Sequence, residues 1–411
     1  MLKRLKGLNR REFLSKSITG MASIGILDIS RKRVLPTNPL GIGQTTKKEI
    51  ITRTLGKTGI RIPIVNMGVM NTLDAALVKK SYEIGVRHFD TAAWYMRGGN
   101  EEMVGQALKD LNARDKVIIS TKIYVPTQQR NMTLEAAKET YLRIAGESLK
   151  RLQTDCVDIL YSHNVPDLKW LNNPGIIEAL QQLKKEGKTR FIGFTTHMNM
   201  TECIKDAIRS GVFDVIETAY NYSLSDDEDY RNTLQQAAKK GIGLVAMKTQ
   251  CSQYWYRQNL PQSLQKFYEG KIVHTAVLKW ALKNDFITTA IPGYTTFQQM
   301  EEDFSVAYDL EYTEDEKKYL EDRKVKLSLG YCRQCQTCLA TCPYGVDIPT
   351  LMRTHMYAAC YSNFYQARDA LDSIPTEKGL RVCQSCQSCS ASCVNRIDIG
   401  QRIDELKNLF V

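Results

Sequence analysis

Short runs rich in β-branched residues alternate with amphipathic stretches between residue 50 and about residue 307. This alternation is typical of repeated βα units with parallel strands. The eight expected strands span residues 64–69, 87–92, 116–123, 156–163, 189–196, 214–221, 243–249 and 287–293. Eight units in a stretch of this length favour the α/β class and a closed (β/α)8 TIM barrel, because an open doubly wound sheet normally has fewer units.

The intervening stretches carry helix signals. Residues 133–152 have apolar positions at helical spacing, and the expected helices 175–186 and 231–240 each end before a glycine. Glycine is favoured where a helix ends. Residues 54–63 are expected to form a hairpin at the barrel floor, and 314–322 an acidic helix. A mainly helical region should follow, with core candidates Leu351, Met356, Ala359, Phe364, Ala367 and Leu371.

Polar residues stand where successive expected strands end. Asp90, Lys122 and His163 lie at carboxyl ends of strands, and Tyr95 follows the second strand. Active sites of such barrels lie at this end. A lone histidine there is more often structural, but the four residues together suit carbonyl reduction. Tyr95 would donate the proton, Lys122 would lower the pKa of Tyr95, Asp90 would hold Lys122, and His163 would orient the carbonyl.

Three segments carry a family resemblance. "HFDTAAWYMRGGNEEMVGQAL" (88–108), "ISTK" (119–122) and "LYSH" (160–163) resemble, in order, the segments that carry the catalytic Asp, Tyr, Lys and His of aldo/keto reductases. The resemblance covers about residues 50–307. It implies an NAD(P)H-dependent oxidoreductase that interconverts a small-molecule carbonyl and an alcohol, with Asp90, Tyr95, Lys122 and His163 as catalytic residues.

The cofactor contacts follow from the same resemblance. No G-x-G-x-x-G motif follows an expected strand, so no Rossmann site is expected. The family holds its dinucleotide along the last strands, at positions that correspond here to Thr195, Glu217, Lys248, Gly293, Thr295 and Gln299. Gln299 stands where the family usually has a basic residue that binds the 2′-phosphate of NADPH, so we expect little preference for NADPH over NADH. Residues 251–263 form a long loop that either lines a substrate pocket or packs over the barrel mouth.

Eight of the twelve cysteines lie in two tight tetrads near the C-terminus. Each tetrad has the spacing C-x2-C-x2-C-x3-C, and the metal-binding cysteines are Cys332, Cys335, Cys338, Cys342, Cys383, Cys386, Cys389 and Cys393. This spacing resembles that of bacterial ferredoxins with two [4Fe-4S] clusters. Structural zinc sites more often use two separated C-x2-C pairs, so zinc is the weaker alternative. The other four cysteines are expected to be buried and uninvolved.

In that ferredoxin pattern the fourth cysteine of each tetrad binds the other cluster. One cluster would use Cys332, Cys335, Cys338 and Cys393. The other would use Cys383, Cys386, Cys389 and Cys342. A pair of clusters implies a ferredoxin-like domain that transfers electrons or docks a redox partner protein.

The N-terminal 48 residues form a basic leader. They hold eleven of the Lys and Arg residues and two acids, a net charge of +9 out of the chain's +11. The rest of the chain is nearly neutral, which argues against nucleic-acid binding. "RREFL" (10–14) before a modestly apolar segment resembles a twin-arginine export signal and predicts a periplasmic protein. A basic tail on a cytoplasmic enzyme is the alternative. No apolar run is long enough to predict a transmembrane span.

The pattern divides the chain into three parts: a leader and linker (1–48), a barrel (49–312) and a dicluster domain (313–411). The main hypothesis is a nicotinamide-dependent carbonyl oxidoreductase with two clusters. A second is an exported iron–sulfur enzyme that keeps a tightly bound cofactor and exchanges electrons with a partner protein. A third is a non-catalytic barrel that acts as a binding subunit.

Overall fold

The computed structural model describes residues 49–250, 273–322 and 330–411. The leader and the loop 251–263 lie outside the described residues. Residues Lys48–Val411 cluster as one compact unit. None of the helices in the described ranges is both long and apolar enough to cross a membrane.

The main sheet has eight parallel strands in sequence order, which confirms the predicted TIM barrel. The strands are β3 (Met67–Gly68), β4 (His88–Asp90), β5 (Ile118–Ile123), β6 (Val157–Ser162), β7 (Thr189–Thr196), β8 (Val215–Ala219), β9 (Gly243–Met247) and β10 (Thr289–Ala290). The first and last strands approach closure, since Val65 forms a parallel bridge with Ala290. The Asn66 amide donates to the Ala290 carbonyl over 2.9 Å.

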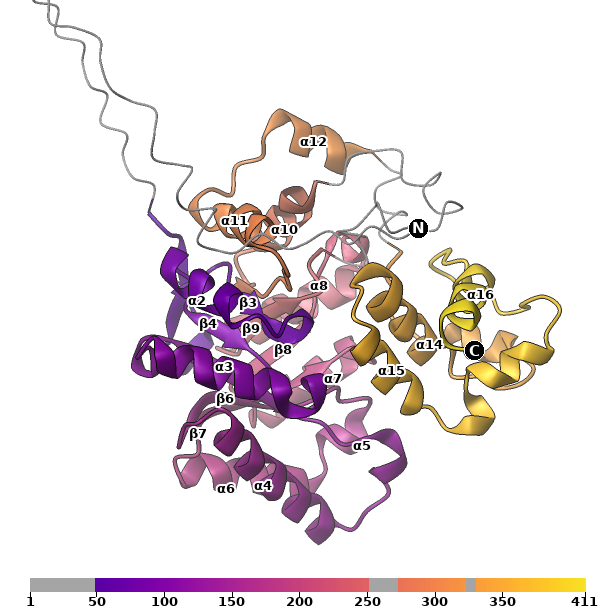
Figure 1. Ribbon diagram of the computed structural model, residues 1–411, viewed down its shortest axis with the longest axis horizontal. Helices are drawn as coiled ribbons and strands as arrows, with labels where there is room; N and C mark the ends of the chain where they lie inside the picture. Colours follow the sequence, from indigo (N-terminus) through magenta and orange to yellow (C-terminus); the bar gives the residue numbers. More distant parts are fainter. Residues whose placement is uncertain (1–48, 251–272, 323–329) are drawn as a thin grey trace, which may run out of the picture. The chain divides into compact units, whose positions relative to one another are not determined.

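Helices cover the outside of the sheet, and Figure 1 shows α3, α4 and α6 packed along one side of it. The barrel helices are α2 (Ala75–Ile84), α3 (Gly99–Asp110), α4 (Leu134–Arg151), α5 (Leu168–Leu171), α6 (Pro174–Lys185), α7 (Met200–Ser210), α8 (Glu228–Lys239), α10 (His274–Leu282) and α11 (Phe297–Ser305). Helix α8 begins three residues before the predicted start at 231, because Asp227 caps it by accepting from the Tyr230 amide.

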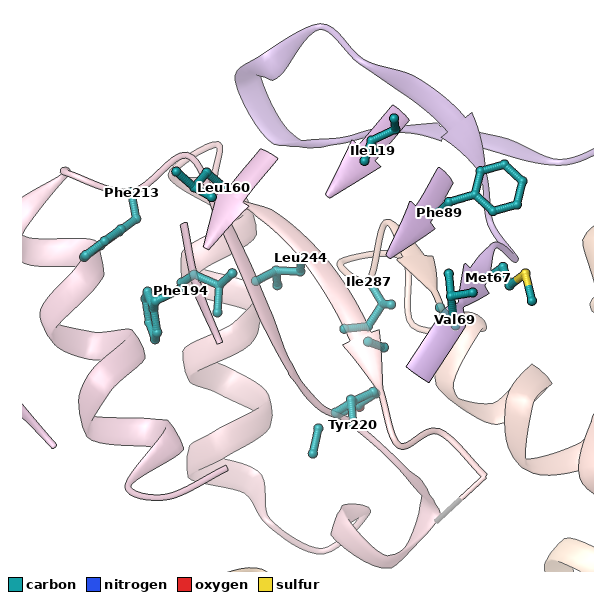
Figure 2. Packing of buried hydrophobic residues seen from close by; sticks show 14 of the residues in the cluster. Met67, Val69, Phe89, Ile119, Leu160, Phe194, Phe213, Tyr220, Leu244 and Ile287 are labelled. Carbon is teal, nitrogen blue, oxygen red and sulfur yellow. The ribbon is translucent and has the colours of Figure 1, made fainter. Parts of the chain in front are cut away.

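Two apolar layers hold the barrel. Leu160 of β6 packs toward the helices, whereas its neighbours Ile159 and Tyr161 point into the barrel, as the alternation of side chains along a strand requires. Figure 2 shows the helix-side layer, where the rings of Phe194 and Phe213 meet with centroids 5.0 Å apart. The predicted hairpin is present as β1 (Thr52–Thr54) and β2 (Arg61–Pro63), and its apolar residues close the barrel floor.

The C-terminal region is mainly helical. After α12 (Glu314–Glu321) it contains α14 (Ile348–His355), a π-helical turn η10 (Met356–Cys360), α15 (Phe364–Asp372) and α16 (Ile399–Phe410). The predicted helical stretch 349–372 is interrupted after η10, where Ser362 has a φ of +51°. Of the predicted core residues, Leu351, Met356 and Ala367 are buried, but Phe364 is 51% exposed. The prediction for Phe364 was wrong because this residue begins a new helix, which changes the face that it occupies.

Candidate active site

The strand ends bring the predicted catalytic residues together. Asp90 ends β4, Lys122 lies near the end of β5, and His163 directly follows β6. Tyr95 begins the short turn η3 (Tyr95–Gly98). The Tyr95 and His163 rings lie edge to face with centroids 5.8 Å apart, and the Lys122 ammonium lies 5.2 Å from the centre of the Tyr95 ring.

Lys122 is the buried centre of a network of acids. Its ammonium donates to the Asp90 carboxylate and, over 3.0 Å, to the Thr91 carbonyl. A second acid, Glu217 of β8, places Oε2 3.5 Å from the same nitrogen. Burial opposes the charge on Lys122, but Asp90 and Glu217 together raise the pKa of Lys122 above its usual value. The lysine therefore remains a cation at neutral pH.

Asp90 is held by a second short chain of hydrogen bonds. The Ser120 hydroxyl donates to Asp90 Oδ2 over 2.5 Å, and this hydroxyl also contacts His88 Nε2 at 2.7 Å. Burial lowers the pKa of His88 to about 4, so the ring is neutral. With both oxygens engaged, the Asp90 carboxylate has a defined orientation toward Lys122.

Tyr95 is buried within this cluster, like Lys122 and His163. Burial raises the pKa of Tyr95, and this effect outweighs the lowering by Lys122 that the sequence predicted. The phenol is therefore protonated at neutral pH and can donate a proton. Met96 and Arg97, directly after it, both have positive φ, a conformation that costs about 1–3 kcal/mol for a residue other than glycine.

Neighbouring polar contacts hold this strained turn. The Asn100 side chain accepts from Thr91 Oγ1 over 2.6 Å and donates to the carbonyls of Val69 and Thr72, each over 2.8 Å. Gly98 packs against Arg151, whose Cδ would lie 2.6 Å from an added Cβ. The turn that carries Tyr95 is thus fixed from both sides.

His163 faces Tyr95 as a neutral ring. Burial lowers the pKa of His163 well below its usual value, and the cations Lys122, Arg353 and Arg130 lower it further. Its Nδ1 has no hydrogen-bond partner among the described residues. A neutral imidazole next to a protonated phenol can contact a carbonyl oxygen without competing as an acid.

A cleft adjoins this cluster. Three of the six predicted cofactor contacts, Glu217, Lys248 and Gly293, line it together with Asp90 and Tyr95. Glu217 Oε2 accepts no hydrogen bond from the described residues, and the Lys122 ammonium is its ion-pair partner at 3.5 Å. Burial lowers the pKa of Lys248 to about 7.

The other three predicted contacts do not line this cleft. Thr195 is fully buried, and its hydroxyl accepts from the Asn164 amide over 2.9 Å. The Gln299 carboxamide oxygen accepts from the Thr295 amide over 2.8 Å. These two residues form the turn that enters α11, beyond the Gly293 end of the cleft.

The C-terminal region contributes residues that the sequence analysis missed. Tyr95 packs in one apolar cluster with Met356 and Tyr357 of η10. Tyr357 and Tyr361 hold the Lys248 ammonium over their rings, 5.1 and 4.9 Å from the centroids. No local motif marks these residues, because their position depends on packing between segments more than 100 residues apart.

The eight tetrad cysteines fall into two neighbourhoods. Four of them, Cys342, Cys383, Cys386 and Cys389, line one cavity of about 510 Å³. In the other neighbourhood, burial raises the pKa of Cys332 to about 11, and the nearby Cys393 and Cys338 thiols raise it too. Cys335 likewise raises the pKa of Cys338.

All eleven described cysteines are free thiols rather than disulfides. Of the remaining ones, Cys203 and Cys360 are buried, Cys156 is partly exposed and Cys251 lies outside the described residues. No group of three or more His, Cys, Asp or Glu side chains in residues 49–250, 273–322 and 330–411 converges as it would on a single metal ion.

Comparison with known proteins agrees with the barrel fold. Residues 68–323, more than half of the chain, match the aldo/keto reductase family. The chain is similar to L-galactose dehydrogenase of Arabidopsis thaliana, with 28% identity over 295 residues that cover 65% of this chain and 90% of the relative. It is also similar to L-glyceraldehyde 3-phosphate reductase of Escherichia coli, with 24% identity over 64% of this chain and 89% of the relative.

Solved structures agree on the fold. An aldo-keto reductase from Bacillus halodurans in its holo form superposes with a TM-score of 0.54 at 22% identity, covering 66% of this chain and 96% of that one. The barrel, the order of its motifs and the family match lead to one conclusion. This chain is an oxidoreductase that belongs to the aldo/keto reductase family.

Proposed function

We propose that this protein interconverts a carbonyl compound and an alcohol by using a nicotinamide dinucleotide, with Asp90, Tyr95, Lys122 and His163 as catalytic residues. The observation that carries the proposal is the position of the Tyr95 ring, with the buried Lys122 ammonium 5.2 Å from its centre and the His163 ring edge to face with it at 5.8 Å. The dinucleotide would supply or accept the hydride. Glu217, Lys248 and Gly293 would hold it in the cleft next to Tyr95.

The roles of the side chains follow from their charges. During reduction, Tyr95 gives its proton to the carbonyl oxygen, and the Lys122 cation stabilises the negative charge left on the Tyr95 oxygen. Asp90 keeps Lys122 charged and in place. His163 hydrogen-bonds the carbonyl oxygen and orients it toward Tyr95. In the oxidation direction the same proton returns to Tyr95.

The direct test uses anaerobically purified full-length protein with a set of aldehydes, ketones and alcohols. Oxidation of NADH or NADPH is followed by absorbance, and the alcohol product is identified by NMR. Stoichiometric conversion supports the proposal. A chain that turns over no carbonyl or alcohol would favour the binding-subunit hypothesis, which the complete four-residue cluster argues against.

We further propose that the C-terminal region is a ferredoxin-like domain that binds two [4Fe-4S] clusters. Four cysteines from two distant segments line one cavity, and they are the set that crosswise ligation requires for one cluster. The Asn395 amide donates to Cys393 Sγ over 3.4 Å, as backbone amides commonly do toward cluster sulfurs.

Electron exchange with a partner protein is the second candidate function. A nicotinamide transfers two electrons as a hydride, whereas a four-iron cluster passes one at a time, and the sequence contains no flavin-binding fingerprint. We therefore expect that NADH or NADPH alone does not reduce the clusters. Anaerobic mixing, followed by cluster bleaching and electron paramagnetic resonance, tests this. Rapid stoichiometric reduction would instead support one electron path through both domains.

A further inference from the structure

A second cavity lies between the barrel and the C-terminal region. Its barrel side includes Tyr95 and His163, the two residues proposed to contact a carbonyl oxygen. The opposite side comes from α14, η10 and α15, which contribute Arg353, Tyr357 and Asp369 in that order. Any substrate at Tyr95 is therefore bounded by residues of the C-terminal region as well as by the barrel.

Arg353 is a cation without an acidic partner in this cavity. Among the described residues its side chain donates one hydrogen bond, from Nη1 to Asn164 Oδ1 at 3.4 Å, and forms no ion pair. The guanidinium carries five N–H donors in a planar fork that matches two oxygens of an anion. A partly buried cation without an ion-pair partner raises the free energy of the folded protein unless an anion neutralises it.

The surroundings of Arg353 do not neutralise its positive charge. His163 and His197 both line the cavity, and burial together with nearby cations keeps both rings neutral. Arg130 is a second cation close to the cavity. Its Nη2 donates to the carbonyl of Asn164, a residue that lines the cavity, over 3.3 Å. No described acid offsets Arg353, and the nearby histidines remain neutral, so a negative group on the ligand would be stabilised there.

Asp369 is the acid that lies on the same side of the cavity. Its Oδ1 lies 3.8 Å from Arg97, and the charged groups that act on it are Arg97 and Asp372 rather than Arg353. Its Oδ2 is buried and has no hydrogen-bond partner among the described residues. Asp369 would therefore repel an anion beside it but accept a hydrogen bond from a ligand hydroxyl.

We infer that Arg353 binds the oxyanion, a carboxylate or a phosphate, of an anionic carbonyl substrate whose carbonyl oxygen lies at Tyr95 and His163. This inference rests on the proposed carbonyl reduction. It assigns substrate selection to the C-terminal region, because the selecting cation belongs to α14 rather than to a barrel loop. Arg353 lines this cavity and not the cleft proposed for the dinucleotide, so its ligand is the substrate.

The kinetic test compares substrates that differ in charge alone as nearly as possible. For full-length protein, kcat/KM is measured for succinic semialdehyde against butanal, and for glyceraldehyde 3-phosphate against glyceraldehyde. The wild type should favour the anionic member of at least one pair by about 10- to 100-fold, the usual range for a hydrogen bond to a charged group. The pair with the larger ratio identifies the carboxylate or the phosphate as the preferred oxyanion.

Variants assign the preference to Arg353. In Arg353→Gln the ratio of kcat/KM for the anionic substrate to kcat/KM for the neutral one should fall to about one. Arg353→Lys should give an intermediate ratio, because lysine keeps the charge but lacks the planar, two-pronged guanidinium. Arg368→Gln is the matched control, since Arg368 is exposed on α15 and covers the Phe410 ring instead of the cavity. The control should retain the wild-type ratio.

A binding experiment separates this inference from the proposed reaction. Isothermal titration calorimetry with succinate and with inorganic phosphate should show binding to the wild type that weakens at least about 10-fold in Arg353→Gln. This measurement decides the role of Arg353 even if no carbonyl is turned over. Equal kcat/KM values for both members of each wild-type pair would overturn the inference. So would an Arg353→Gln variant that loses thermal stability and slows on neutral and anionic substrates alike, because that pattern indicates a purely structural contact with Asn164.

Discussion

The ammonium nitrogen of Lys122 lies 3.5 Å from Glu217 Oε2 and also hydrogen-bonds Asp90, so a single buried cation serves two carboxyl groups. The resemblance to known reductases implied one acid partner for Lys122 and a cofactor contact for Glu217. In the structure Glu217 lies in both places, since it lines the cleft proposed for the cofactor and also contacts Lys122. Burial and Asp90 raise the pKa of Glu217 to about 8, so its charge appears mainly above that pH.

Replacing Glu217 by Gln should move the pH dependence of alcohol oxidation to lower pH. Oxidation needs the Tyr95 phenolate, and the Glu217 charge raises the pKa values of both Tyr95 and Lys122. Removing this charge lowers the pKa of Tyr95, so the rate should rise at lower pH than in the wild type. The measurement is kcat/KM for an alcohol from pH 7 to 11. Glu217→Asp, which keeps the charge, should move the rise much less, and a rise displaced to higher pH in Glu217→Gln would contradict the assignment.

Tyr95→Phe should lower carbonyl reduction by about 10²–10⁴-fold, because the proton donor is removed. Stability should change little, since no hydrogen bond from the Tyr95 hydroxyl to the described residues is lost. Steady-state kinetics and thermal unfolding measure the two effects. Tyr365→Phe, at a 41% exposed position on α15, is the matched control. Wild-type activity in Tyr95→Phe would remove this residue from the mechanism.

The purified protein should contain about eight irons and eight acid-labile sulfides per chain, from two four-iron clusters. Cys386→Ala should lose about half of the iron, because Cys386 lines the cavity shared by four tetrad cysteines. Cys203→Ala should lose none, because Cys203 is buried in the barrel helix α7. Metal analysis and electron paramagnetic resonance check both. Stoichiometric zinc without sulfide would refute the cluster assignment.

The wild type should show little preference for NADPH over NADH, and Gln299→Arg should raise that preference by about 10-fold or more. A charge-assisted contact to the 2′-phosphate is stronger than a neutral one. Gln298→Arg is the matched control, because the neighbouring Gln298 is exposed and bonds Glu302 instead of Thr295. Ratios of kcat/KM for the two dinucleotides give the answer. A wild-type preference of several hundredfold for NADPH would contradict it.

Replacing Arg10 and Arg11 together by Lys should retain the protein in the cytoplasm, since a receptor reads the arginine pair rather than the charge alone. Replacing Lys3 and Lys6 by Arg leaves the pair intact and should permit export. Cell fractionation of the native source and of the variants measures the distribution. Native protein found in the cytoplasm alone would show that the leader is not an export signal.

Much of the barrel and its reactive centre could be predicted from local pattern. The carboxyl ends of parallel barrel strands all meet at one end, so Asp90, Lys122 and His163 had to converge once the strands were identified. The sequence by itself therefore determined the eight-stranded barrel and the clustering of its strand-end residues. It also determined two thiol-rich tetrads, because their spacing lies within short segments.

Tertiary structure decided the rest. The pairing of Glu217 with Lys122 depends on the distance across the barrel between β8 and β5, which no local motif encodes. The presence of Arg353 and Tyr357 beside Tyr95 depends on how α14 and η10 pack against the barrel. The contacts of Arg353 and Tyr357 with the Tyr95 region join residues more than 250 positions apart, and many weak packing interactions select them together. Periodicity and spacing describe only residues that are close together in the chain. The residues of α14 and η10 that line the cavity beside Tyr95 could therefore be identified only from the folded protein.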